Sequence, residues 1–314
     1  MNKFSISQRT SHLFIEQKKV WQQLRENYEA LEKVHTRIVQ CEGFTVQLQY
    51  NPKRLVNATA NVSENHIKQR PCFLCQNNRP SEQQSILYKE EYLILCNPFP
   101  IFSPHYTVTH FHHTPQIIEN HFEIMLLLAQ DFSEYETIFY NGAKCGASAP
   151  DHFHFQISPK GKIPIEQEVK NEQRKKKQKN IHNITVSVLQ NVGRSVVVIK
   201  GKEINGIKNV FFSFCEKLQE RNTTIEEPKM NILCFYENEF WHVIIFLREK
   251  HRPDVFFEEG EKRILISPAV VDMGGLIITP IEKDFLHVDA KIIEQIFKEV
   301  SLSENVLEEI LQEL

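Results

Sequence analysis

The segment His-Phe-His-Phe-Gln, residues 152–156, alternates polar and aromatic side chains, and this alternation constrains the fold more than any other feature of the chain. Successive side chains of a β-strand point to opposite faces of the sheet. The three polar residues, His152, His154 and Gln156, therefore share one face, and the two phenylalanines between them share the other. We predict a strand whose aromatic face is buried in a core and whose polar face forms a reactive surface.

The composition excludes several classes of protein. The 314 residues are 41% hydrophobic and 25% charged, which is typical of a globular protein with one large or two ordinary domains. A net charge of −3 argues against an extended nucleic-acid partner. No apolar run is long enough to span a membrane, and the N-terminal segment lacks the apolar region of a signal peptide. Seven cysteines with a single C-x-x-C pair indicate reduced thiols and a cytoplasmic location.

Apolar periodicity predicts both helices and strands. Helical patterns cover residues 11–40, 120–132, 289–300 and 303–314, and Ser303 is a candidate N-cap of the last helix. Strand patterns cover 43–52, 92–102, 105–111, 135–141, 152–158, 184–190 and 194–201, a hairpin within 231–251, and two strands around a Met-Gly-Gly turn within 262–280. We therefore predict an α+β protein with two lobes, each a mostly antiparallel sheet with flanking helices.

A change of composition separates the two lobes. Residues 168–180 are polar and strongly basic, without apolar periodicity. We predict a catalytic lobe over 1–167, a basic linker or flap over 168–182 and a second lobe over 183–314. The segment reads either as a mobile surface linker or as a basic flap over an anionic ligand.

The polar face of the predicted strand suits nucleophilic chemistry at phosphorus. A neutral imidazole is a good nucleophile when its other nitrogen is held by an acceptor. Attack by His154 on a nucleotide α-phosphate would form a covalent nucleotidyl-histidine, and Gln156 could donate to a phosphate oxygen as charge builds there. The preceding Gly-rich loop offers backbone N–H groups and Ser148 for the phosphates. The alternative is a pair of structural histidines.

These motifs resemble the histidine-triad superfamily, in particular the branch of galactose-1-phosphate uridylyltransferases, GDP-hexose phosphorylases and diadenosine tetraphosphate phosphorylases. That branch has H-x-H-x-Q where simpler triad hydrolases have a third histidine. The resemblance implies two histidine-triad-like lobes, His154 as the nucleophile and Gln156 as its phosphate-binding companion. It also implies substrate contacts by Asn141 and Gly142, in and after the strand that precedes the glycine loop. One departure from the family pattern is Asp151, inserted before His152.

The cysteine pair has the spacing of one half of a zinc site. Two intervening residues allow Cys72 and Cys75 to reach one ion. In the uridylyltransferases the same C-F-L-C motif combines with a later histidine and with the first histidine of H-x-H-x-Q. The resemblance thus implies a structural zinc held by Cys72, Cys75, His152 and one histidine of the segment 110–113, of which we favour His113 over His112 and His110. The alternative is two ordinary buried thiols.

The same resemblance assigns other substrate contacts. Asn97 and Phe99 are expected to line the nucleoside pocket, and Arg79 follows the cysteine motif as a further candidate. In the second lobe, Arg248, Lys250, His251 and Arg252 form a basic cluster that could meet a phosphate or a sugar phosphate. A solvated strand end is the alternative for that cluster.

We therefore expect a nucleotidyltransferase or phosphorylase that acts on a nucleoside diphosphate sugar or a dinucleotide, with phosphate or a sugar phosphate as acceptor. A homodimer is left open, and no nucleic-acid or membrane partner is expected. Two alternatives remain: a nucleotide hydrolase of the same superfamily, and a zinc-containing nucleotide- or RNA-binding protein without catalysis.

Overall fold

The computed structural model describes residues 4–221 and 227–314, whose strands form one large and one small sheet. The first three residues lie outside the described residues. They belong to the N-terminal segment in which we expected no signal peptide. The large sheet has ten strands in the order β3-β4-β5-β7-β6-β11-β12-β10-β9-β8, and all neighbours are antiparallel. Its strands are β3 Ser85–Tyr88, β4 Tyr92–Cys96, β5 Tyr106–His110, β6 Glu136–Asn141, β7 His154–Pro159, β8 Lys175–Ile181, β9 Ile184–Leu189, β10 Val196–Gly201, β11 Met230–Glu237 and β12 Phe240–Leu247.

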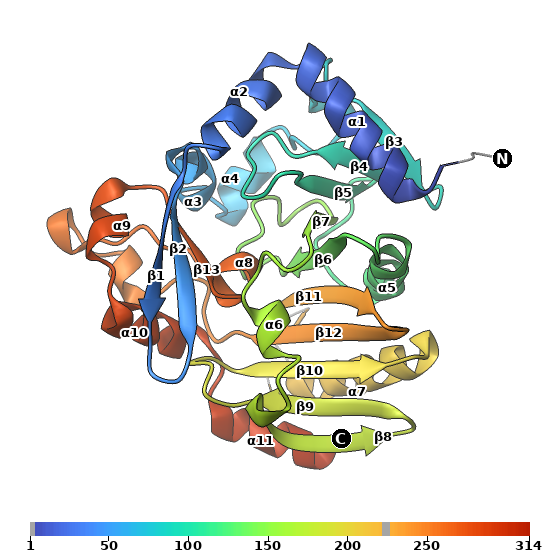
Figure 1. Cartoon of the computed structure of the whole chain (residues 1–314), viewed down its shortest axis with the longest axis vertical. Helices are drawn as coiled ribbons and strands as arrows, with labels where there is room; N and C mark the ends of the chain where they lie inside the picture. The colour runs from blue at the N-terminus through green and yellow to red at the C-terminus, as the bar shows by residue number, and fades with distance from the viewer. Residues whose placement is uncertain (1–3, 222–226) are drawn as a thin grey trace.

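The two halves of this sheet repeat one topology, although the sequence contains no strict repeat. From the outer edge inward, each half holds its first, second, third, fifth and fourth strand in chain order. In each half a helix joins the third strand to the fourth, namely α5 (Phe122–Asp131) and α7 (Ile204–Glu220). The halves meet where β6 pairs with β11 and Asn141 lies opposite Asn231, at the centre of the stack of strands in Figure 1. The predicted α+β class with two lobes is confirmed, and the lobes share one continuous sheet.

Helices cover one face of both halves. They are α1 (Ile6–Val20), α2 (Gln22–Leu31), α5, α7 and α11 (Glu304–Glu313). The rings of Phe122 on α5 and Phe211 on α7 stack with centroids 3.8 Å apart. Phe153 and Phe155 are fully buried in the same core, so the aromatic face of the 152–156 alternation is where we expected it.

On the opposite face, the covering lies mostly over the second half, and its core also includes Phe139 on β6. There β1 (His35–Gln40), β2 (Thr45–Tyr50) and β13 (Leu276–Thr279) form the small sheet, which packs on the large one together with α10 (Ala290–Val300). Leu233 on β11 and both Ile244 and Phe246 on β12 are buried in this second core. The first half keeps a polar face that the small sheet does not fill.

Two predicted elements are wrong in part. The helix expected over 11–40 is two helices interrupted at the buried and extended Trp21, and residues 35–40 form β1, which pairs with β2 along its whole length. Within 262–280 we expected two strands. Val270–Met273 is instead the helical turn α8, because the Asp272 carboxylate accepts the Ala269 N–H and closes the turn.

The basic segment 168–182 contains the edge strand β8, antiparallel to β9. Lysines on an edge strand hinder pairing with another chain, because a further strand at the free edge would have to pack against their charged side chains. The division of the chain at residues 167 and 182 stays a prediction.

Short helices connect the larger elements. They are α3 Leu55–Ala58, α4 Glu64–Gln69, α6 Ile165–Glu168, α8 and α9 Glu282–His287. Across the described residues, none of the helices has both the length and the apolar character that crossing a bilayer requires.

Gly193 is required where the small sheet docks on the large one. It lies between β9 and β10 with φ +69°, and a Cβ there would stand 2.4 Å from the Phe44 ring, whereas a Cβ on Gly260 (φ +58°) would meet nothing within 4 Å. We expect Gly260→Ala to lower the free energy of unfolding by about 1–2 kcal/mol from backbone strain alone. Gly193→Ala should add a further ~1–3 kcal/mol of overpacking. Chemical denaturation measures both, and equal losses would contradict this docking.

Candidate active site

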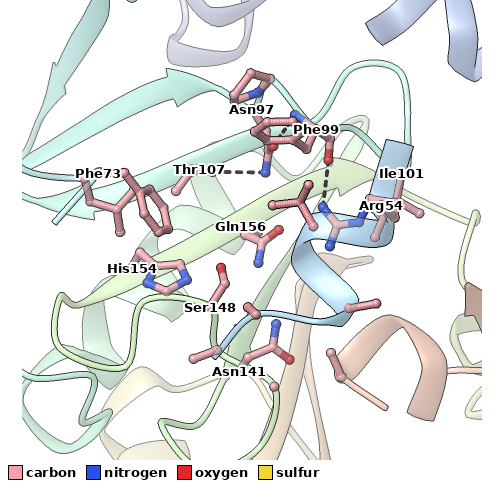
Figure 2. A pocket seen from close by; sticks show the side chains of 18 of the residues that line it. Arg54, Phe73, Asn97, Phe99, Ile101, Thr107, Asn141, Ser148, His154 and Gln156 are labelled. Carbon is pink, nitrogen blue, oxygen red and sulfur yellow. Dashed lines mark hydrogen bonds between the residues drawn. The ribbon is translucent and has the colours of Figure 1, made fainter. Parts of the chain in front are cut away.

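A cavity of about 610 Å³ lies on the uncovered polar face of the first half. His154 and Gln156 line it from β7, and Thr107 lines it from the neighbouring β5, opposite Gln156 in register. Figure 2 shows His154, Gln156 and Ser148 pointing toward its middle. Six of the expected catalytic and substrate-binding residues line this cavity: Asn97, Phe99, Asn141, Ser148, His154 and Gln156.

The His154 ring is held with one nitrogen fixed. Its Nδ1 lies 2.9 Å from the carbonyl oxygen of His152, to which it donates, so Nε2 carries the free lone pair. The side chain is 5% exposed. Desolvation by burial lowers the pKa of His154 to about 4. The imidazole is therefore neutral near pH 7 and can act as a nucleophile.

Gln116 fixes the point at which β7 begins. Its Oε1 accepts the His154 N–H at 2.7 Å, and its Nε2 donates to the carbonyl oxygens of His154 and Asn141 at 2.9 and 3.0 Å. The β6–β7 ladder pairs Phe139 with Gln156 and goes no further toward His154. The fully buried Gln116 therefore satisfies backbone groups that the ladder leaves free.

The Gln156 amide is oriented by His105. The Ile101 N–H donates to His105 Nδ1 at 3.3 Å, which leaves the proton on Nε2. That Nε2 lies 2.8 Å from Gln156 Oε1. Burial, with a smaller contribution from Arg54, lowers the pKa of His105 to about 3, so the ring is neutral. Because its oxygen is already engaged, Gln156 offers its NH₂ group to the cavity.

The Asn141 amide is oriented in the same sense from the second lobe. Its Oδ1 accepts from Asn231 Nδ2 and from the Val270 N–H, both at 2.8 Å. Asn231 Oδ1 in turn accepts from Arg248 Nη1 at 2.6 Å. The NH₂ group of Asn141 is left for the cavity, and Figure 2 shows it facing Ser148. Two amide donors thus lie close to His154.

Three other expected residues have different surroundings. Both ends of the Asn97 amide are engaged, with Thr107 Oγ1 at 3.3 Å and the Phe99 N–H at 2.9 Å, so Asn97 shapes the turn beneath Phe99. Gly142 donates its N–H to the Met230 carbonyl. Within the described part of the chain, Gly142 and Arg79 are not among the residues that line the cavity.

Positive charge is in excess on the cavity wall. Arg54, Arg70 and Arg252 line it, and Asp272 is the carboxylate among the described lining residues. Asp272 Oδ1 and Oδ2 accept the Ile278 and Ala269 N–H groups, and burial raises its pKa to about 6. A chain with a net charge of −3 therefore concentrates cations at this cavity, as an anionic ligand requires.

The basic cluster of the second lobe divides between two roles. Arg248 is buried and donates to the Val300, Pro268, Lys250 and His251 carbonyls and to Asn231, so all its nitrogens serve the fold. Lys250 pairs with Asp254 and Glu299 outside the cavity. His251 and Arg252 are the members of the cluster that line the cavity.

The four expected metal ligands come together beside the cavity. One ligand atom from each of Cys72, Cys75, His113 and His152 lies within 4.8 Å of the other three. Cys72 Sγ is 3.3 Å from His152 Nδ1, and Cys75 Sγ is 3.2 Å from His113 Nδ1. Two thiols and two imidazoles at these separations are compatible with tetrahedral zinc. Of the three histidines in the segment 110–113, His113, which we favoured over His110 and His112, belongs to this group.

The surroundings of the cluster fit a bound cation. His152 Nε2 donates to the His110 carbonyl at 2.9 Å, and His113 Nε2 lies 3.5 Å from the Asp151 carboxylate, so both rings turn Nδ1 toward the sulfurs. Burial and the nearby Cys72 raise the pKa of the Cys75 thiol to about 11, so a cation is needed to keep it ionised. Within the described chain, Arg79 Nε and Nη1 are buried without a hydrogen-bond partner, and thiolates would satisfy them.

The second half of the sheet offers no equivalent cavity face. β12 is the counterpart of β7 by topology, yet Ile244 and Phe246 occupy the face that His154 and Gln156 occupy on β7. These side chains are buried beneath the small sheet. The chemistry-bearing polar face therefore belongs to the first half.

Sequence reasoning missed Arg54, His105, Gln116 and Asn231. Alternation along the strand 105–111 could have found His105, because it shares a face with Thr107, next to Gln156 in register. The other three depend on contacts between segments far apart in the chain, which no local pattern reports.

Two family models match the chain. Residues 13–159 match a family described as a domain of unknown function (DUF4922), and residues 166–314 match a family described as the GDPGP1-like C-terminal domain. No curated protein matches significantly.

The chain is similar in fold to solved structures of a yeast Ap4A phosphorylase. The complex with AMP is 13% identical, with 91% of this chain and 96% of that chain covered and a TM-score of 0.60. The structure described without a ligand is 12% identical (90% and 96% covered, TM-score 0.61), and the Ap4A complex is 13% identical (90% and 96%, TM-score 0.59). At this identity the likeness establishes the fold.

The low pKa of His154 can be measured directly. We expect its imidazole resonances in a histidine-labelled sample to titrate near pH 4, because burial disfavours the charged ring. The unfolded chain takes up this proton near 6.5, so the group lowers stability as pH falls from 6.5 toward 4. His154→Asn identifies the resonance by its loss. A midpoint near 6.5 would contradict the buried, neutral ring.

Proposed function

We propose that this chain is a nucleotidyltransferase of the phosphorylase type within the histidine-triad superfamily. Its branch of that superfamily includes galactose-1-phosphate uridylyltransferases, GDP-hexose phosphorylases and diadenosine tetraphosphate phosphorylases. Its substrate is a nucleoside diphosphate sugar or a dinucleotide, and its acceptor is phosphate or a sugar phosphate. The GDPGP1-like match and the likeness to an Ap4A phosphorylase that was solved with AMP and with Ap4A support this choice.

One observation carries the proposal. The neutral His154 ring has Nδ1 engaged by a carbonyl and lines a cationic cavity. A histidine that served only the core would have no reason to keep a free ring nitrogen on a cavity wall. This arrangement suits in-line attack by Nε2 on phosphorus.

The reaction consists of two displacements at the same phosphorus atom. In the first, His154 Nε2 forms a bond to the α-phosphorus, and the P–O bond to the leaving phosphate breaks with its electron pair on that oxygen. In the second, an oxygen of the acceptor phosphate attacks the α-phosphorus, and the P–N bond breaks with its electron pair returning to Nε2. Both phosphate groups enter or leave as anions, so neither step needs a proton from a side chain.

Neutral donors stabilise the charge that develops at phosphorus. The NH₂ groups of Gln156 and Asn141, each with its amide oxygen already engaged, are turned toward the cavity, and Ser148 adds a hydroxyl. Donors held in place before the reaction cost no reorganisation when the charge appears. An amide, moreover, is no base for water, so Gln156 favours an acceptor that is already ionised over hydrolysis.

A structural zinc at Cys72, Cys75, His113 and His152 completes the proposed site. When bound, such an ion supplies a rigid cross-link and no open coordination position. It ties the loop of the cysteine pair to His152, whose carbonyl oxygen orients His154.

The covalent intermediate provides the decisive experiment. We expect incubation with UDP-, GDP- and ADP-sugars and with Ap4A to add the mass of a nucleoside monophosphate with at least one of them, as seen by intact mass spectrometry. His154→Ala should abolish the adduct, because no other group replaces its Nε2. His182→Ala, at an exposed turn, is the matched control. A wild-type chain without adduct and without turnover across this panel would instead favour a nucleotide-binding protein.

Zinc has a test that does not depend on activity. We expect about one equivalent of zinc in purified protein, measured by elemental mass spectrometry, and its loss in Cys72→Ser. Removing one ligand of a structural site should lower the melting temperature, since binding and folding free energy are coupled. Cys96→Ser, at a buried cysteine outside the cluster, should keep the metal. A metal content unchanged by Cys72→Ser would refute this ligand set.

A further inference from the structure

Two walls of the cavity differ in chemistry. His154, Gln156 and Ser148 form a wall of neutral groups, and Figure 2 shows Arg54 on the other side of the cavity from His154. The lining residues that the second lobe contributes are His251, Arg252, Ser267, Ala269, Val271, Asp272 and Ile278. The reaction derived above gives no role to the charged wall.

Arg54 presents unpaired N–H groups to this space. Its Nη1 donates to the Phe99 carbonyl at 2.8 Å, which holds the guanidinium in place. Its Nε and Nη2 make no hydrogen bond within residues 4–221 and 227–314, and Arg54 forms no salt bridge there, although the charge of the Asp272 carboxylate acts on it. Burial lowers the pKa of Arg54 to about 10, so the group is still a cation at neutral pH.

Arg252 is built into the same wall. Its Nη2 donates to the Ala60 carbonyl at 3.1 Å, in the segment that follows Arg54, and its Nε donates to Ser267 Oγ at 3.0 Å. The guanidinium stacks 4.3 Å from the centroid of the Phe256 ring. Its Nη1 has no partner in the described part of the chain, and neither does the group have an ion pair there. The charge is thus positioned but not neutralised.

His251 adds a third donor. Its Nε2 lies 3.3 Å from Ser267 Oγ, and that hydroxyl, which accepts from Arg252, donates to the ring. Nδ1 therefore carries the proton of the neutral imidazole. Burial lowers the pKa of His251 to about 3, so this tautomer persists at neutral pH. Arg54, Arg252 and His251 thus line the cavity without a salt bridge in the described part of the chain, and the nearby Asp272 carboxylate is engaged by the Ile278 and Ala269 N–H groups.

We infer that Arg54, His251 and Arg252 form an oxyanion subsite for a phosphate group, distinct from the neutral donors around the α-phosphate. This inference rests on the proposed function and names the place of its second reactant. The subsite first holds the phosphate of the leaving group and then the inorganic phosphate that replaces it. Planar guanidinium groups match the oxygens of a phosphate, and each charge-assisted bond is stronger than a neutral one.

One subsite serves both half-reactions for a chemical reason. The leaving oxygen and the attacking oxygen occupy the same apical position, opposite His154 Nε2, because both displacements are in line. A phosphate bound there replaces a sugar phosphate or a nucleotide phosphate oxygen for oxygen.

The experiment separates the second half-reaction from the first. A nucleoside 5′-phosphorimidazolide, whose leaving group is imidazole, loads His154 without using the subsite. The adduct is then isolated and mixed with inorganic phosphate, and the rate at which the adduct mass disappears is followed against phosphate concentration. The variants are Arg54→Gln, Arg252→Gln and the charge-retaining Arg252→Lys. Lys250→Gln, which removes a neighbouring charge outside the cavity, is the matched control.

We expect the phosphate concentration at half-maximal rate to rise about 10-fold or more in Arg54→Gln and Arg252→Gln, as for loss of a charge-assisted hydrogen bond. Arg252→Lys should recover part of the loss, and Lys250→Gln should match wild type. Normal loading with an unchanged phosphate dependence in both Gln variants would overturn the subsite while leaving the proposed function intact. Failure of the wild type to load would instead count against the proposed function.

Calorimetry keeps the inference testable if a variant folds poorly. Inorganic phosphate titrated into the unmodified full-length chain should bind at one site. His251→Gln should weaken phosphate binding because it removes a subsite donor, whereas His154→Ala removes no subsite donor and should bind phosphate as the wild type does. Equal phosphate binding in His251→Gln and wild type would contradict the assignment of His251.

Discussion

The pairing of β6 with β11 is the interaction on which the rest of the structure depends. It joins two five-stranded halves of like topology into one antiparallel sheet. It also sets Asn231 opposite Asn141, so the second half reaches the cavity through a hydrogen bond at the seam. In a buried chain of hydrogen bonds, Arg248 donates to Asn231 and Asn231 donates to Asn141. Such pairing matters because an unpaired polar group is costly in surroundings of low dielectric constant.

The same constraint explains the distribution of chemistry over the cavity. Backbone pairing holds β5, β6 and β7 rigidly, and the neutral groups Thr107, Asn141, His154 and Gln156 on these strands line the cavity. The charged groups come instead from the segments that cross over the sheet, around Arg54 and Arg252. The paired strands fix the neutral groups, and hydrogen bonds to backbone carbonyls fix Arg54 and Arg252 on the connecting segments.

Local pattern was sufficient for much of this fold. The two-residue period of 152–156 predicted the buried phenylalanines and the shared face of His154 and Gln156. It was wrong for His152, which precedes β7 and lies with the cysteine pair rather than on the cavity wall. The C-x-x-C spacing and the family resemblance predicted four side chains that indeed lie together. Short segments were harder: residues 35–40 directly follow a helical pattern, although Thr36, Ile38 and Val39 are β-branched residues that favour the strand they form with β2. Likewise, α8 depends on the Asp272 carboxylate capping a turn rather than on periodicity.

The apolar covering of the second half-sheet has a consequence for how this molecule can vary. Two copies of one architecture are present, yet substitutions meet different demands in each. On β7, substitutions at His154 and Gln156 change the polar groups that line the cavity. At the matching positions of β12, substitutions change the packing volume, because Ile244 and Phe246 are buried beneath the small sheet. Substitutions on the cavity face of the first half can change which ligand binds only while the second half keeps its packed core. Variation in ligand binding is therefore confined to one of the two similar halves.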